Sequence, residues 1–263
     1  GMHVANAIYG MRELELTPDT NWSTAELGKA YALGATAYKE GEAAVVNEMK
    51  RINKCVYDRS DEEINALYDK GRAVSLAYFD TIYSLVGTKF DAMFFESEAG
   101  PRGKELVLNN PEIFAESEGA RVFLGEQYGL HTRVFLNHEG LPTYEAKELA
   151  LAKMKEEVLG EYDHSVISTS NEITEYFKVL KKAISFVYTE LEPKTEHIGH
   201  GTVRLTTGKM SSRTGDVIKA TDFIDKIAAI ARERIEAGSM EVDTIDTLST
   251  QVALGAIKYA TLK

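Results

Sequence analysis

The sequence has 263 residues, of which 44% are hydrophobic, so it is long enough for one large domain or two small ones with a hydrophobic core. No apolar run approaches the roughly 20 residues of a membrane-spanning helix, and the N-terminal residues carry no secretory signal. The net charge of -11 argues against a surface devoted as a whole to nucleic-acid binding, because such surfaces gather lysine and arginine. Any RNA contact is therefore expected at a local patch such as residues 178–182, or on parts absent from this chain.

Residues 23–87 are predicted to be helical. Ser23 can cap the start of a helix, with Glu26 as its partner in a capping box. Three acidic residues at 61–63 stand where the positive end of a following helix is expected. Apolar residues then recur at helical spacing, and Gly87 can end the run.

From residue 89 onward, short β-prone segments alternate with amphipathic helical segments. Strands are predicted at 92–95, 121–124, 134–136, 165–168 and 202–205, and helices near 103–108, from Pro142 and over 171–188. Such alternation predicts βαβ units and a mainly parallel sheet, and the tail returns to helix over 221–238 and 249–262. A doubly wound fold usually binds its nucleotide at the ends of its first strands. Those strands are expected to be missing here, because the chain opens on helices without a glycine-rich turn.

A polar loop between Gly208 and Gly215 carries the clearest chemical signal. It contains Lys209, three hydroxyl side chains and Arg213. Cations and hydroxyls suit a triphosphate whose negative charge must be neutralised as pyrophosphate departs. The chain has no Walker A pattern, which excludes a P-loop. Composition alone would equally allow a solvated polar hairpin.

This loop, Gly208-Lys209-Met210-Ser211-Ser212-Arg213-Thr214-Gly215, resembles the Lys-Met-Ser-Lys-Ser signature of class I aminoacyl-tRNA synthetases, in the form common among arginyl-tRNA synthetases. Four further segments resemble the arginyl family in its own order, namely residues 89–98, 140–149, 216–225 and 255–259. The resemblance implies an α/β fold, the second part of a Rossmann-like class I catalytic domain flanked by helical segments. It implies a helical insertion-type region at 1–88, a nucleotide-binding portion at 89–215 ending in the loop, and a helical linker at 216–263.

The resemblance also implies which residues bind the amino acid. Glu96 would face the substrate guanidinium, since a planar cation suits a carboxylate with fork geometry. Tyr144 would line the arginine pocket and supply a hydroxyl. Glu148, one helical turn later, would share the face of Tyr144 and hold a cationic group of the substrate. Without the resemblance, these residues would be read as exposed acids and ordinary helix surface.

The same resemblance places residues around ATP. Lys209 would stabilise the departing pyrophosphate, while the other polar residues shape a mobile loop. The implied catalytic set is Lys209, Ser211, Ser212 and Arg213, and the implied ATP-binding set is His200, Gly201, Val203 and Lys209.

Three positions depart from the family pattern. Glu148 stands where the family usually has aspartate, so its carboxylate reaches one methylene further. Ile173 stands where related sequences have glutamine, and it cannot make an amide contact. Ser212 stands where other class I enzymes have a second lysine, although arginyl enzymes often lack it.

The stretch His197-Ile198-Gly199-His200 spells the histidine signature of class I synthetases, but we interpret it as a false match. The signature belongs at the turn after the first strand, where it opens a helix far upstream of the Lys-Met-Ser loop. Here the loop follows too closely for a helix, and residues 201–205 are predicted to form a strand. In arginyl enzymes a similar stretch lies close to the adenosine.

The remaining histidines and the single cysteine indicate little chemistry. The histidines lack the spacing of metal ligands, and no metal site is expected. Cys55 excludes an internal disulfide, suits a reducing cytoplasm, and is expected to be a small buried hydrophobe.

The sequence therefore predicts the core of an arginine–tRNA ligase, with ATP as substrate and Mg²⁺ implied as the counter-ion of ATP. Its partners would be arginine, ATP and tRNA, the last mostly through parts absent from this chain, and its oligomeric state is not predicted. The true histidine signature and the anticodon-binding domain are missing, so we expect a truncated piece that is inactive alone. Two alternatives stay open: a non-catalytic synthetase-like binding protein, and a small nucleotidylyltransferase with a similar phosphate loop.

Overall fold

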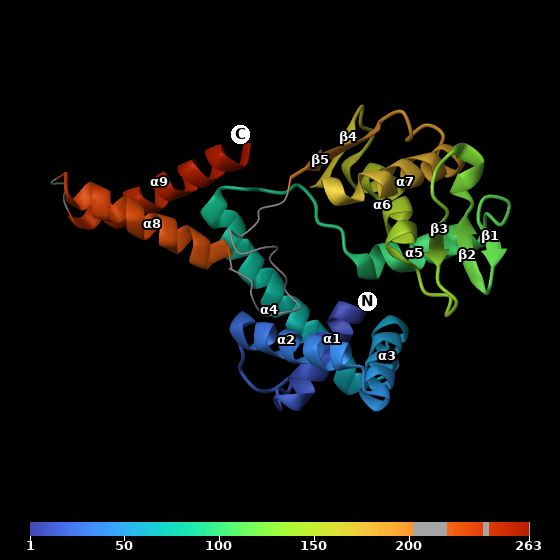
Figure 1. Ribbon diagram of the computed structural model, residues 1–263, viewed down its shortest axis with the longest axis horizontal. Helices are drawn as coiled ribbons and strands as arrows, with labels where there is room; N and C mark the ends of the chain where they lie inside the picture. The colour runs from blue at the N-terminus through green and yellow to red at the C-terminus, as the bar shows by residue number, and fades with distance from the viewer. Residues whose placement is uncertain (202–219, 239–241, 263) are drawn as a thin grey trace. The chain divides into compact units, whose positions relative to one another are not determined.

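The computed structural model describes residues 1–201, 220–238 and 242–262 (Figure 1). The chain divides into two compact units, one of residues 1–89 together with 204–263 and one of residues 90–203. Among the helices in the described ranges, none combines the length and the apolar character needed to cross a membrane.

The first unit begins with helices α1 (Met2–Glu13), α2 (Thr24–Glu40), α3 (Ala43–Asp58) and α4 (Glu62–Val86). The predicted capping box is confirmed, because Ser23 and Glu26 exchange hydrogen bonds at the start of α2. Helix α4 ends at Gly87 as predicted, in the left-handed conformation that glycine adopts without strain. Helix α1 precedes the helical run predicted at 23–87 and lies within the helical region that the resemblance implies at 1–88.

Helices α1 and α2 cross with their backbones almost in contact. A β-carbon added at Gly10 would lie 1.9 Å from the carbonyl oxygen of Ala30, and one at Gly34 would lie 1.9 Å from that of Asn6. Only glycine allows this approach. Below the crossing is a core that includes Ile8, Met11, Trp22, Ile52, Ile64 and Leu67, against which the half-buried Cys55 packs.

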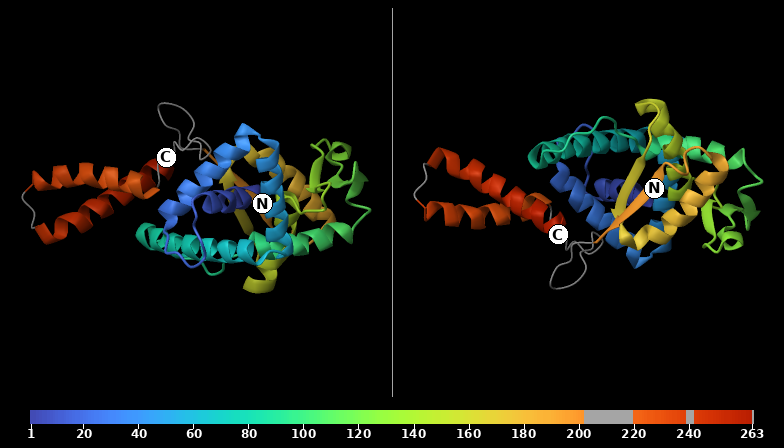
Figure 2. Two further views of the ribbon diagram at one scale, coloured as in Figure 1. Left: turned by 90° about the horizontal axis from the view of Figure 1, so that it is seen from below. Right: turned by 90° about the horizontal axis from the view of Figure 1, so that it is seen from above.

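The predicted C-terminal helices are confirmed as α8 (Ala220–Glu236) and α9 (Val242–Leu262), the second of which begins earlier than expected. They run side by side as a hairpin in every view (Figures 1 and 2). Arg232 contributes to this pairing, because its guanidinium lies 2.5 Å from the carboxylate of Asp246.

The second unit contains an antiparallel sheet in the order β1 (Ala115–Ser117), β2 (Ala120–Phe123) and β3 (Arg133–Leu136). The prediction of a mainly parallel sheet is therefore wrong for this part. Its connections are short: Glu118 and Gly119, both with positive φ, turn β1 into β2 as in a tight hairpin. The short helix η1 (Gly125–Tyr128) stands between β2 and β3.

The strands β4 (Ser165–Ser170) and β5 (Thr195–His200) pair in parallel, with Ser165 opposite Thr195 and Ser170 opposite His200. Helix α7 (Thr174–Val187) joins them, preceded by the short helix η2 (Asn171–Ile173). This βαβ unit contains the strand predicted at 165–168 and the helix predicted over 171–188. Strand β5 was not predicted, and the strand predicted at 202–205 lies outside the described residues.

Helices α5 (Glu96–Leu108) and α6 (Tyr144–Leu159) pack against each other. The strand predicted at 92–95 is wrong: these residues have no regular structure, and Phe95 immediately precedes α5. A short apolar run fits a strand or a buried loop equally well, and here Phe94 packs onto the contact between α5 and α6. Helix α6 begins at Tyr144, not at Pro142.

Candidate active site

The start of α6 is tied to the end of β3. The hydroxyl of Thr143, the residue before the helix, donates to the carbonyl oxygens of Val134 at 2.7 Å and Phe135 at 3.0 Å. The side chain of Asn137 holds the intervening turn by accepting from the backbone N–H of Leu141 at 2.9 Å. The first turn of α6 therefore has a defined position, with Tyr144 as its first residue.

Tyr144 and Glu148 share a face of α6, as their spacing predicts. The tyrosine hydroxyl donates a hydrogen bond to the carboxylate of Glu148. Burial raises the pKa of Glu148 above its usual range, while the bond from Tyr144 and the charge of Lys155 oppose the rise. Burial also raises the pKa of Tyr144, with further contributions from the charges of Glu148 and Glu96. The site is thus a partly buried region of negative charge.

Lys155 lies two helical turns beyond Glu148. Its ammonium donates to the hydroxyl of Ser165 at 2.5 Å. Burial lowers the pKa of Lys155, and the negative charge of Glu148 opposes that change. One side of Glu148 is therefore balanced by a cation belonging to the protein itself.

Glu96 begins α5 and is paired with a lysine of α6. The ammonium of Lys147 lies 2.6 Å from its carboxylate, and the lysine side chain is 10% exposed against 65% for the glutamate. The charge of Glu96 contributes to the raised pKa of both Tyr144 and Glu148, so the three groups lie near one another. That Glu96 faces the substrate guanidinium stays a prediction.

A row of rings runs from α6 to β5. Tyr144 lies 5.2 Å from Tyr176 between ring centroids, Tyr176 lies 5.0 Å from Phe177, and Phe177 stacks on His197 at 4.1 Å. The His197 ring hydrogen-bonds the hydroxyl of Thr169 at 2.7 Å, and burial lowers its pKa. The acidic start of α6 is thereby connected to the two parallel strands.

The phenol of Tyr176 is 5% exposed, and its oxygen has no hydrogen-bond partner among the described residues. A buried hydroxyl without a partner costs about 1–3 kcal/mol. We therefore expect Tyr176→Phe to raise the free energy of unfolding by about 1 kcal/mol, measured by urea denaturation.

Tyr162→Phe is the matched control, because the Tyr162 hydroxyl donates to the carbonyl oxygen of Ala152 at 3.2 Å. Its removal should lower the free energy of unfolding by about 1 kcal/mol. A loss of the same size in Tyr176→Phe would show that its hydroxyl does have a partner.

The carboxyl ends of β4 and β5 are a second candidate binding region. In open α/β folds, ligands bind beyond the carboxyl ends of parallel strands. A β-carbon on Gly199 would lie 3.1 Å from the α-carbon of Asn171, so the end of β5 packs tightly on η2. His200 is exposed, and its Nδ1 donates to the carbonyl oxygen of the exposed Gly201 at 2.8 Å.

The stretch His197 to His200, interpreted from the sequence as a false match to the histidine signature, forms the last residues of strand β5. Ile173, which departs from the family pattern, packs its partly buried side chain against the core of the second unit. The proposed ATP residues Val203 and Lys209, and the loop residues Ser211, Ser212 and Arg213, lie outside the described residues.

Lys147 and Tyr176 are among the residues of this region that were not predicted. Lys147 stands between Tyr144 and Glu148, and only its position inside this segment could have drawn attention to it. Tyr176 resembles an ordinary core aromatic, because its place beside Tyr144 depends on how α6 and α7 pack. Sequence spacing within one helix cannot show either contact.

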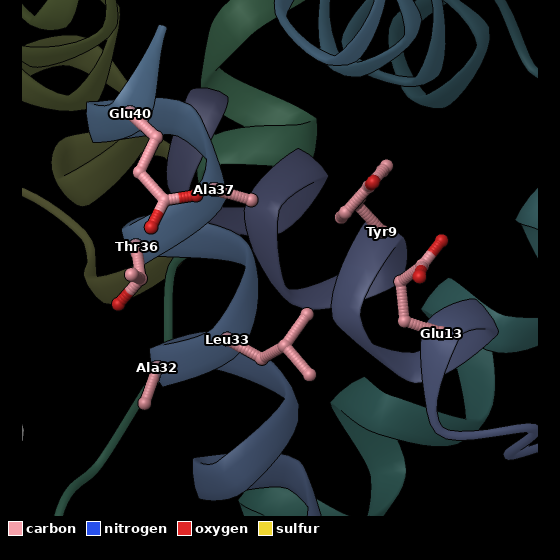
Figure 3. Close-up of a pocket in the computed structure, with 7 residues that line it drawn as sticks. All are labelled: Tyr9, Glu13, Ala32, Leu33, Thr36, Ala37 and Glu40. Atoms are coloured by element: carbon pink, nitrogen blue, oxygen red, sulfur yellow. The ribbon is translucent and has the colours of Figure 1, made fainter. Parts of the chain in front are cut away.

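A groove of about 470 Å³ lies in the first unit, between α1 and α2 (Figure 3). Two carboxylates, Glu13 and Glu40, and the phenol of Tyr9 contribute to its lining. The groove is shallow and acidic. Glu96, Tyr144 and Glu148, by contrast, belong to the second unit.

Two solved structures share the fold. The arginyl-tRNA synthetase of Thermus thermophilus matches with a TM-score of 0.72 and 19% identity, over 99% of this chain and 49% of that one. The enzyme of Plasmodium falciparum matches with a TM-score of 0.66 and 18% identity, over 98% of this chain and 42% of that one. The predicted combination of helices and sheet is confirmed as the fold that these structures share.

Curated relatives match at higher identity. The arginine–tRNA ligase of Clostridium acetobutylicum is 28% identical over 226 residues, which are 85% of this chain and 40% of the relative. That of Bacteroides fragilis is 29% identical over 236 residues, which are 86% of this chain and 39% of the relative. The chain thus spans about 40% of the length of these relatives. The family model described as "tRNA synthetases class I (R), catalytic domain" matches residues 25–263. The chain belongs to this family of class I tRNA synthetases.

Proposed function

We propose that the chain forms the amino-acid-binding part of an arginine–tRNA ligase. The observation that carries the proposal is the half-buried Glu148 beside the exposed Tyr144 at the start of α6, inside a region of negative charge. A buried carboxylate with a raised pKa gains from a cationic partner, and the arginine side chain is always protonated. The names of the relatives support the same substrate.

The reaction would proceed in two steps. The carboxylate of arginine attacks the α-phosphorus of ATP, an oxygen–phosphorus bond forms, and pyrophosphate leaves. The 3′-terminal hydroxyl of tRNA then attacks the arginyl carbonyl carbon, and AMP departs. Mg²⁺ would accompany ATP as its counter-ion, and a cytoplasmic location fits this role.

Different residues would bind the amino acid and ATP. Tyr144 and Glu148 would hold the amino acid, so that its carboxylate faces the phosphate. His200, Gly201 and Val203 would lie near the adenosine at the carboxyl ends of the parallel strands. Lys209, with Ser211, Ser212 and Arg213, would neutralise the charge that develops on the pyrophosphate.

A non-catalytic binding protein is the second candidate. Ile173 favours it, because its side chain packs on the core where related sequences offer an amide. Such a protein would bind arginine or tRNA without forming the adenylate.

The test uses the protein in the full length that its gene encodes. Pyrophosphate exchange with ATP is measured in the presence of tRNA, with each of the twenty amino acids in turn. Exchange that depends on arginine supports the proposal. Exchange with another amino acid would overturn the substrate, and arginine binding without exchange would favour the second candidate.

The affinity for arginine should depend on the ionisation of Glu148. Only the carboxylate attracts a cation, so the affinity should fall as the pH drops through the raised pKa of Glu148. Below that pKa the dissociation constant should rise about tenfold per pH unit. Calorimetry across the acidic range should place the midpoint above the ordinary glutamate value of about 4.3, and Glu148→Gln should remove the transition. A midpoint at or below that value would contradict the assignment.

A further inference from the structure

We propose that Lys155, held on β4 by Ser165, is the internal counter-ion of Glu148. It keeps this carboxylate ionised while the site is empty, from a distance that leaves the carboxylate able to bind the substrate. Lys155 is thus a positioning residue that acts on the amino acid through Glu148. The inference rests on the proposed function, which assigns the cationic amino acid to this glutamate.

The first argument is the placement of the two charges on α6. Lys155 follows Glu148 by two helical turns, so both side chains lie on one face of the helix. Long side chains in a helix point back toward its N-terminal end, and the ammonium of Lys155 therefore points toward Glu148. Both side chains are partly buried, where two charges attract each other more strongly than in water.

The second argument is the anchor that holds the ammonium. Lys155 donates to the hydroxyl oxygen of Ser165 at 2.5 Å, and Ser165 is 9% exposed at the start of β4. The Ser165 hydroxyl also forms a hydrogen bond with Tyr162. The phenol of Tyr162 donates its own proton to the carbonyl oxygen of Ala152 at 3.2 Å, one turn before Lys155 on α6. Ser165 must therefore donate to the phenol, and its oxygen remains to accept from the lysine.

The third argument is the charge balance around Glu148. The titratable groups around it come from three helices and are Glu96 of α5, Tyr144, Lys147 and Lys155 of α6, and Tyr176 of α7. The two tyrosines are neutral, because burial raises their pKa, and Lys147 is paired with Glu96 at 2.6 Å. In the described part of the chain, Lys155 supplies the positive charge that acts on Glu148, and Glu148 supplies the negative charge that acts on Lys155.

Holding the lysine on Ser165 has a consequence for substrate binding. A lysine bonded directly to Glu148 would have to be displaced by the guanidinium. A lysine held on β4 favours the ionised carboxylate without occupying it. The arrangement therefore extends toward acid the pH range in which the site attracts a cation.

The test is the pH dependence of the dissociation constant of arginine, measured by calorimetry with the full-length protein. In Lys155→Met the midpoint should move to higher pH by about one unit, so that arginine binds about tenfold more weakly in the acidic range. Where Glu148 is fully ionised, arginine should bind at least as tightly as in the wild type, because a repelling cation is gone. Weaker binding at every pH with an unmoved midpoint would show a purely structural role and overturn the inference.

Lys153→Met is the matched control. Lys153 also lies on α6, but it pairs with Glu156 and its side chain is 36% exposed. Its replacement should leave the midpoint unchanged. A shift as large as that of Lys155→Met would mean that any cation lost from this helix has the same effect, which overturns the assignment to Lys155.

Lys155→Gln guards against a folding defect in Lys155→Met. The amide keeps a donor for Ser165 while it removes the charge, so both variants should show the same shift. In a Glu148→Gln background, Lys155→Met should show no transition, and a remaining transition would assign the titration to another group. If the wild-type protein does not bind arginine at any pH, the proposed function itself fails. If it binds arginine and both lysine variants share its midpoint, only the role of Lys155 fails.

Discussion

Glu148→Gln is expected to lower kcat/KM for arginine by about 10²–10³-fold, because it removes one member of a partly buried charge pair with the substrate. The glutamine keeps the shape of the side chain and can still accept a hydrogen bond from Tyr144. The fall in kcat/KM therefore measures the contribution of the negative charge. Steady-state charging of tRNA with arginine measures it.

Glu148→Asp keeps the negative charge but shortens the side chain, so it tests whether the length of the side chain matters. The resemblance to arginyl-tRNA synthetases implies aspartate at this position, so the shorter carboxylate should retain most of the activity. Glu157→Gln, at the other end of α6, is the control for a lost carboxylate on the same helix. Wild-type kinetics in Glu148→Gln would remove this residue from the site.

Gly103→Ala is expected to destabilise the second unit by about 3 kcal/mol or more. Its β-carbon would lie 2.2 Å from the carbonyl oxygen of Ala146, and a backbone atom cannot move aside as a flexible side chain can. The two helices would have to separate. Denaturant unfolding followed by circular dichroism measures the loss.

Gly28→Ala provides the matched control. Gly28 lies within α2, and a β-carbon there meets no atom within 4 Å. Alanine favours the helix over glycine, so this variant should be neutral or more stable by about 0.5–1 kcal/mol. Equal stability of Gly103→Ala and Gly28→Ala would show that α5 and α6 do not approach this closely.

Local signals in the sequence predicted local structure well. The capping box of Ser23 and Glu26 and the terminating Gly87 depend on residues only a few positions apart, and both are confirmed. The start of α5 at Glu96 is different. It was missed because Gly100 and Pro101 disfavour a helix, whereas packing against α6 stabilises one.

Strand pairing was harder to predict than strand existence. The antiparallel pairing of β2 with β3 depends on the short connection through η1. Strand β5 contains two histidines and a glycine, residues that do not favour a strand, and the sequence places the strand at 202–205 instead. Its parallel partner β4 lies before α7, and no local pattern shows that pairing.

For the candidate site too, the sequence predicts contacts within one helix but not contacts between helices. The spacing of Tyr144 and Glu148 predicted a shared helix face, which their hydrogen bond confirms. The pairing of Glu96 with Lys147 joins two helices, and the contact of Tyr144 with Tyr176 joins two others. Such contacts follow from tertiary packing, so the sequence could name the residues but not their partners.

The central claim is that the acidic start of α6 recognises a positively charged amino acid. Its most direct test is a comparison of the dissociation constants of arginine and citrulline, measured by calorimetry with the full-length protein. Citrulline has nearly the shape of arginine but a neutral side chain. Arginine should bind at least about 30-fold more tightly, as expected for a desolvated charge pair. Equal affinities would contradict the claim.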